Sequence, residues 1–186
     1  PHPLPENAPQ TTNFQITSPQ VNGQYIFRDG QVNYKLQLSD TDLEDVNFLR
    51  VQLQYAPPGT PSTSAAWAKF HECPIDQMSL SSGYYGDYFY GSDLLAGTWL
   101  IRAVVDDDMM EGVSPTTVTV IIDRTAPNST VSPVTPYWKK TTSVTINATA
   151  SDGASGVKEV KLYYQYRAST AVAWPTTWAR SWSSPD

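Results

Sequence analysis

Carboxylates gather where several predicted strands end, and carboxylate oxygens are ligands that calcium prefers. Three consecutive aspartates, Asp106, Asp107 and Asp108, occupy a turn in the stretch VVDDDMMEG. Asp40 follows an earlier strand that should end on the same side, and Asp123 closes the last strand of the first half. These five side chains suggest a calcium site, and no other cofactor is indicated. The spacing is not that of an EF-hand, and it favours the alternative of a solvated acidic turn.

A second candidate site consists of aromatic residues in the stretch GYYGDYFYG. In a strand, successive side chains point to opposite faces, so Tyr84, Tyr88 and Tyr90 share one face and Tyr85 and Phe89 share the other. Exposed tyrosine rings can stack on sugar rings while their hydroxyls form hydrogen bonds. The first group therefore predicts a ligand-binding face for glycans. The alternative is ordinary core and surface packing, because one of the two faces must be core.

Two asparagines begin Asn-x-Ser/Thr sequons, the acceptor pattern for N-glycosylation. Asn128 starts the sequence Asn-Ser-Thr and Asn147 starts Asn-Ala-Thr. Asn147 falls within a predicted strand, where the alternation turns it outward. Both are candidate glycosylation sites in an archaeal or eukaryotic source.

Catalytic chemistry has little support in the sequence. The two histidines are His2, in a proline-rich terminal segment, and His71, in a predicted strand. His71 lies in His-Glu-Cys, which lacks the His-Glu-x-x-His spacing of zinc proteases, and no nucleophile elbow is near it. The single cysteine, Cys73, excludes an intrachain disulfide, and a buried apolar role is the simplest interpretation of it. We therefore expect no enzymatic activity.

The elements that must position these residues are strands. Valine, threonine, tyrosine and tryptophan are plentiful, runs typical of helices are absent, and short alternating segments are separated by turn residues. An antiparallel all-β fold follows. The predicted strands of the first half are Asn13–Ser18, Gln31–Ser39, Asn47–Ala56, Trp67–His71, a strand starting in Gly83–Gly91, Gly97–Asp107 and Thr116–Asp123.

The chain also repeats itself. Gln31–Asp40 aligns with Ser143–Asp152 at an offset of 112 residues, and both segments alternate and end in Ser-Asp. Asn47–Tyr55 aligns with Lys158–Tyr166 at an offset of 111. Several ordered matches at nearly one period indicate a tandem duplication. Asp123–Pro127 is then the link between two domains, and its proline makes it stiff.

The motifs of one copy resemble a known kind of repeat. The stretch AGTWLIRAVVDDDMMEGVSPTTVTVIIDRTAP is similar to the end of bacterial and archaeal immunoglobulin-like or fibronectin type III-like repeats of large cell-surface proteins. SDGASGVKEVKLYYQYR resembles their second and third strands. Trp99 stands where the pattern usually has tyrosine. The resemblance implies a linker or tail over residues 1–8, an Ig-like sandwich over 9–123, and the N-terminal half of a second, truncated sandwich over 124–186.

The resemblance also implies a setting and a role. Such repeats occur in S-layer, filament and stalk proteins, so we expect an extracellular, cell-surface or secreted structural spacer that contacts itself or neighbouring repeats. An adhesin or a carbohydrate-binding accessory domain of a secreted enzyme is the alternative, with surface glycans as partners and Trp174 as a further ring. The net charge of −6, without a basic cluster, argues against nucleic acid, and no apolar run is long enough to insert in a membrane.

Overall fold

The computed structural model describes residues 8–39, 49–106, 111–135 and 143–183. Its described part is all-β, with antiparallel sheets and only short 3-10 helical turns. The chain divides into two compact units, Pro1–Arg124 and Thr125–Asp186, which we call unit 1 and unit 2. The division falls inside the segment Asp123–Pro127. Each unit is described separately.

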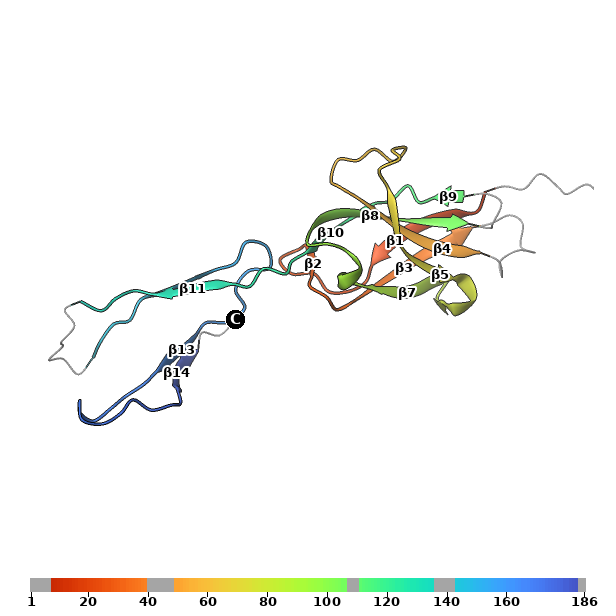
Figure 1. Ribbon diagram of the computed structural model, residues 1–186. Coiled ribbons are helices and arrows are strands. Elements are labelled where there is room, and N and C mark those ends of the chain that lie inside the picture. Colours follow the sequence, from red (N-terminus) through yellow and green to blue (C-terminus); the bar gives the residue numbers. More distant parts are fainter. Residues whose placement is uncertain (1–7, 40–48, 107–110, 136–142, 184–186) are drawn as a thin grey trace, which may run out of the picture. The chain divides into compact units, whose positions relative to one another are not determined.

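The first sheet of unit 1 has four antiparallel strands (Figure 1). Its central strand β3 alternates strictly, with Val32, Tyr34 and Leu36 buried and Gln31 and Asn33 exposed. One face of this sheet therefore belongs to the core and the other to solvent. In spatial order the strands are β1 (Gln10–Ile16), β3 (Gln31–Ser39), β7 (Tyr84–Tyr90) and β6 (Ser79–Ser81).

The second sheet of unit 1 is built around its longest strand, β8. All of its pairings are antiparallel except one, in which β10 runs parallel to the short strand β2. The path through the sheet is β2 (Tyr25–Phe27), β10 (Val118–Ile122), β8 (Gly97–Asp106), β4 (Arg50–Ala56) and β5 (Ala68–Pro74), and β9 (Glu111–Val113) also pairs with β8.

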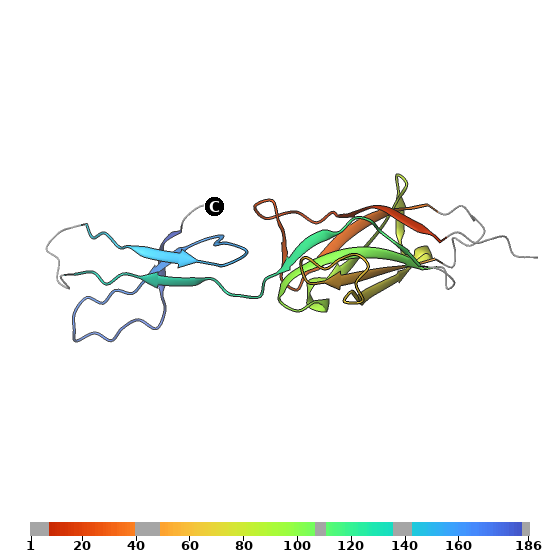
Figure 2. The same ribbon diagram turned by 90° about the horizontal axis from the view of Figure 1, so that it is seen from above.

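The two sheets of unit 1 share one hydrophobic core, which makes the unit β-sandwich-like (Figure 2). The largest fully buried side chains come from strands of both sheets. Burying a side chain of this size stabilises the fold by about 1.5–3 kcal/mol. Examples from the first sheet are Phe14, Tyr34, Leu36 and Phe89, and examples from the second are Leu53, Ile101, Val105 and Ile122.

The alternation in the sequence located the long strands well. The predicted strand Gln31–Ser39 coincides with β3, and the strand predicted over Gly97–Asp107 becomes β8, one residue shorter. β1 begins at Gln10, three residues before the predicted start at Asn13. Asn13 has a positive φ of 53° and lies in a β-bulge, and the bulge interrupts the alternation on which the prediction was based. The short strands β2, β6 and β9 were not predicted, because three residues carry too little alternation.

The described part of unit 2 contains two separate strand pairs. β11 (Asn128–Val131) pairs with β12 (Ala148–Ser151), and β13 (Lys161–Tyr164) pairs with β14 (Ala179–Ser183). The strand predicted over Ser143–Asp152 is thus shorter, and Asn147 immediately precedes it.

The first of these pairs has the register of its counterpart in unit 1. Asn128 is opposite Ser151 in β11 and β12, just as Gln10 is opposite Ser39 in β1 and β3. In the sequence, Asn128 and Gln10 each follow an Ala-Pro dipeptide, and Ser151 and Ser39 each precede an aspartate.

Candidate functional site

The solvent-facing side of the first sheet carries an aromatic pair. Tyr88 and Tyr90 are 41% and 46% exposed, and their rings meet edge to face with 5.6 Å between centroids. Phe89, between them in the sequence, is buried in the core. The alternation predicted this division of β7. In the neighbouring strand β3, Asn33 lies opposite Tyr88 and Gln31 lies opposite Tyr90.

An open hollow of about 470 Å³ lies beside this pair, around Gly86. Gly86 is flanked by Lys35 on β3 and Ser79 on β6, and its missing side chain leaves space between them. The Lys35 ammonium lies over the ring of Tyr84, 4.4 Å from its centroid. The residues lining the hollow are Thr17, Asn33, Tyr34, Lys35, Gln77, Ser79, Gly86, Asp87 and Tyr88.

A polar cluster joins the two sheets on the inner side of the same strand. Asp87 Oδ2 lies 3.0 Å from His71 Nε2 of β5 and accepts a hydrogen bond of 3.3 Å from the hydroxyl of Tyr34 on β3. The rings of Tyr34 and His71 also meet edge to face at 6.0 Å. The Cys73 thiol lies near the same carboxylate and donates a hydrogen bond of 3.5 Å to the Pro74 carbonyl. Because β5 belongs to the second sheet, these contacts tie the sheets together.

The environment of the cluster perturbs its ionisable groups. Burial alone would raise the pKa of Asp87, but hydrogen bonds from His71 and the Tyr88 amide outweigh it and lower the pKa. Burial, followed by the nearby Asp87 carboxylate, raises the pKa of Tyr34. The same two causes raise the pKa of the Cys73 thiol to about 12, so the thiol is protonated at neutral pH. Asp87 is consequently the anion of the cluster at neutral pH.

The aspartates proposed as calcium ligands do not form one group. Asp106 ends β8, whereas Asp123 follows β10, whose last residue Ile122 is paired with Gly97 at the start of β8. The two aspartates therefore lie at opposite ends of a ten-residue strand, about 30 Å apart at 3.3 Å per residue. The prediction that they share a site is wrong, because antiparallel pairing separates the ends of successive strands.

Calcium binding by the other proposed aspartates remains a prediction. Asp40, Asp107 and Asp108 lie outside the described residues. Asp106 accepts a hydrogen bond of 3.3 Å from Gln52 Nε2. Among the described residues, no three His, Cys, Asp or Glu side chains form a group that could hold a metal ion.

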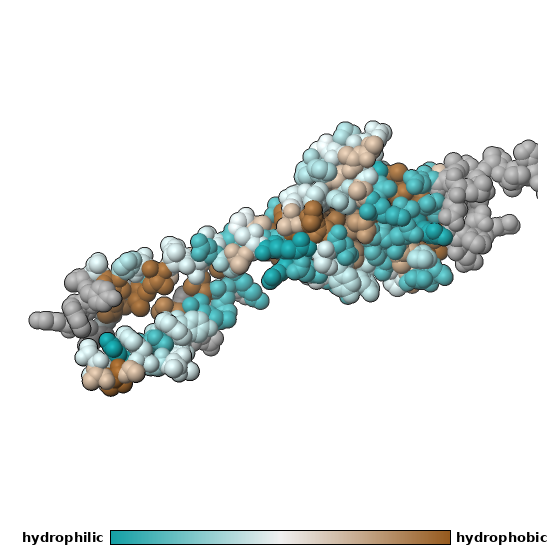
Figure 3. Space-filling model, in the orientation of Figure 1, coloured by the Kyte–Doolittle hydropathy of each residue, from teal (hydrophilic) through white to brown (hydrophobic). Residues whose placement is uncertain are grey.

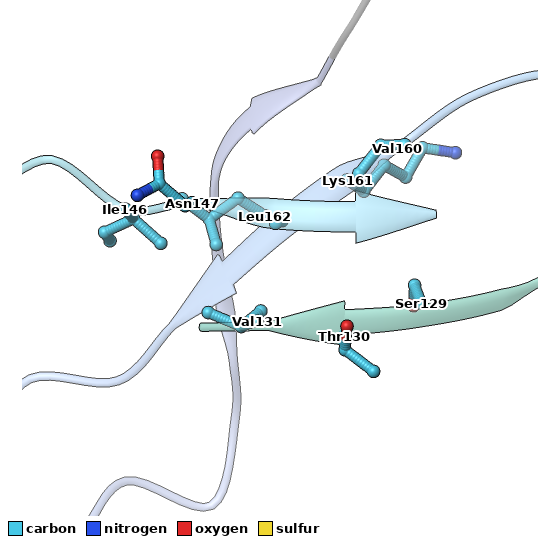
Figure 4. A pocket seen from close by; sticks show the side chains of 9 residues that line it. Ser129, Thr130, Val131, Ile146, Asn147, Val160, Lys161 and Leu162 are labelled. Atoms are coloured by element: carbon cyan, nitrogen blue, oxygen red, sulfur yellow. The ribbon is translucent and has the colours of Figure 1, made fainter. Parts of the chain in front are cut away.

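Both sequon asparagines are exposed in unit 2. Asn128 is the first residue of β11, and the Asn147 carbonyl accepts a hydrogen bond of 2.8 Å from the Ser132 amide. Asn147 also borders a hollow of about 370 Å³ whose lining residues Figure 4 shows. Glycosylation at either residue remains a prediction.

The hollow of unit 2 corresponds to the core of unit 1. Ile146 and Leu162 line it, and at the offsets of 112 and 111 they match Tyr34 and Val51. Tyr34 and Val51 are at most 1% exposed, whereas Ile146 is 45% exposed. Further apolar side chains of unit 2 are open to solvent (Figure 3). Apolar side chains that match the core of unit 1 are thus exposed in the described part of unit 2.

Sequence reasoning missed Gly86, Lys35 and Asp87. The signal for Asp87 was available, because the alternation of β7 turns it inward with Tyr85 and Phe89, and a carboxylate at an inward position needs partners. The hollow at Gly86 depends on which residues pair across strands, and the sequence alone did not give this register.

Comparison of the chain with models of known protein families and with curated proteins finds no match. None of the helices in the part of the chain that the structure describes has the length and apolarity needed to cross a membrane.

Proposed function

We propose that this chain is a non-catalytic spacer segment of an extracellular cell-surface protein, such as an S-layer, filament or stalk protein, built from Ig-like or fibronectin type III-like sandwiches in tandem. The strand order of unit 1 supports the fold part of the proposal. Its first sheet, β1-β3-β7-β6, corresponds to the A-B-E-D sheet of immunoglobulin domains, and β10-β8-β4-β5 corresponds to G-F-C-C′.

The arginine of the motif in β8 also supports this assignment. Arg102 is buried, and its Nε and Nη2 donate to Gln54 Oε1 on β4 at 3.0 and 2.8 Å. Its Nη1 donates to the carbonyl of Ser62, and its guanidinium lies 4.2 Å from the ring centroid of Trp67. The arginine of the motif thus has a structural use, which is to anchor the connection between β4 and β5.

The observation that carries the spacer role is how the chain leaves unit 1. The Asp123 amide donates to the Phe27 carbonyl at 2.8 Å. Arg124 Nε donates to Asp29 Oδ1 at 2.7 Å, and its Nη2 donates to the carbonyls of Gly91 and Leu94 at 3.0 and 2.9 Å. Only Thr125, Ala126 and Pro127 then separate this anchor from β11. A short link fixed at its origin suits a module that transmits position and force.

Arg124→Ala tests the anchor. The substitution removes three hydrogen bonds that a partly exposed guanidinium makes, so we expect the backbone from Arg124 to Ala126 to loosen. In 15N relaxation of the full chain, order parameters there should fall from about 0.85 to below about 0.6. Arg28→Ala is the matched control, since Arg28 also pairs with Asp29 but its side chain is 78% exposed. Low order parameters at these residues in the unmodified chain would contradict a stiff link.

A further inference from the structure

We propose that the hollow around Gly86 on the outer face of the first sheet binds one pyranose unit of an uncharged glycan, with Tyr88 as its stacking ring. This inference goes beyond the spacer role and does not depend on it. It gives unit 1 a specific contact with surface polysaccharide. Three features of the described residues support it.

The first feature is the shape of the site. Gly86 interrupts a row of larger side chains, with Tyr84 and Tyr88 two residues away on the same strand and Lys35 and Ser79 on the neighbouring strands. The resulting hollow has an open volume of about 470 Å³, which is within the size range of small-ligand sites. A methyl group at residue 86 would come 3.3 Å from Ser79 Oγ, so a side chain there would occupy the space.

The second feature is the combination of aromatic and hydrogen-bonding groups. Tyr88 is 41% exposed although it contacts Tyr90, so part of its ring is free to receive the apolar face of a sugar. Asn33 Oδ1 already accepts a hydrogen bond of 2.7 Å from Gln31, which leaves the Nδ2 group of Asn33 as a donor at the rim. Ser79 and Lys35 add further polar atoms around the same space.

The third feature is charge, which selects among glycans. Lys35 and Asp87 are the residues of opposite charge around the hollow. The Lys35 ammonium lies on the outer face of the sheet and the Asp87 carboxylate on the inner side of the strand, and the two charges balance. Among the described residues, Lys35 has no carboxylate partner, and its ammonium lies over the Tyr84 ring. Asp87 Oδ2 is already occupied by Tyr34 and His71. A ligand rich in hydroxyls suits this site better than an acidic sugar, because the Asp87 carboxylate behind the strand balances the charge of Lys35.

The test is a 15N NMR titration of the full chain with two oligosaccharides of equal length. The probes are a neutral one, such as a cello- or manno-oligosaccharide, and oligogalacturonate, each at about 1–10 mM. We expect the neutral probe to shift the amides of Gly86, Asn33 and Tyr88, with an affinity that does not change between low and high salt. Tyr88→Ala should weaken this binding about tenfold or more.

Tyr166→Ala is the matched control, since Tyr166 is an exposed tyrosine of unit 2. It should leave the affinity unchanged. Unshifted amides around Gly86 with the neutral probe, or shifts that Tyr88→Ala leaves intact, would overturn the proposal. Binding of oligogalacturonate alone, weakened by salt, would overturn it too, because it would show recognition of charge. Unchanged amide shifts of β8, which belongs to the other sheet, would confirm that Tyr88→Ala folds.

Discussion

Replacing Asp87 with asparagine is expected to lower the free energy of unfolding of unit 1 by about 1.5–3 kcal/mol at pH 7, the range for hydrogen bonds to a charged group. The carboxylate is 15% exposed and interacts with His71 and Tyr34 from two different sheets. An amide of the same size keeps the packing but loses the charge. Because Asp87 links the sheets, the loss should appear throughout the sandwich.

Residue-resolved hydrogen exchange of the full chain measures this effect without interference from unit 2. Amides of β3 and β7 that exchange by global unfolding should exchange about 10- to 100-fold faster in Asp87→Asn. Asp76→Asn is the matched control, because Asp76 is exposed. Equal exchange rates in Asp87→Asn and the unmodified chain would show that the cluster does not hold the sheets together.

The pH dependence of the same variant follows from the lowered pKa of Asp87. In the unfolded chain an aspartate titrates near pH 3.9. Since the pKa is lower in the folded state, the carboxylate contributes its full stability above the unfolded pKa and loses it as the pH falls through the folded pKa. The difference in stability between the unmodified chain and Asp87→Asn should therefore shrink below about pH 5. A difference that stays constant down to pH 2.5 would contradict this assignment.

The second large effect is expected for Gly112→Ala. A Cβ atom at residue 112 would lie 1.5 Å from the carbonyl oxygen of Pro9 and 2.7 Å from its carbon. Both are backbone atoms, so the clash cannot be relieved by rotating a side chain. β9 and the segment entering β1 would have to separate. The cost should be about 1–3 kcal/mol, as for overpacked cores, and thermal unfolding with circular dichroism would measure it.

Gly30→Ala provides the control for this substitution. Nothing lies within 4 Å of a Cβ built at residue 30, and its φ is not in the left-handed region. It should leave the melting temperature of the chain nearly unchanged. If Gly112→Ala were equally harmless, the close approach of Pro9 to β9 would be wrong.

The fold was largely predictable because period-two alternation marks long, half-buried strands. β3 carries this pattern over nine residues and its core face follows from it directly, whereas β8 is buried on both faces from Ile101 to Val105. The pairing of the strands with one another was harder to predict. The parallel contact of β10 with β2 joins segments about 95 residues apart, and nothing local in either strand specifies it.

The candidate sites were less predictable, because they depend on which strands become neighbours. The aromatic face of β7 followed from alternation alone. The hollow at Gly86 needs the register of three strands, and the Asp87 cluster needs two sheets to face each other. The calcium group failed in part for the same reason. Asp106 and Asp123 each lie at the end of a predicted strand. The two strands are antiparallel neighbours, so these ends lie at opposite edges of the sheet.

The central claim is that this chain is a spacer segment of an assembled cell-surface protein. The most direct measurement is electron microscopy of the source cells with an antibody raised against the full chain, together with the mass of the native protein in cell extracts. The account predicts label on a surface layer, fibre or stalk and a large native assembly. Label confined to the cell interior, or a discrete soluble protein of small native mass, would contradict it.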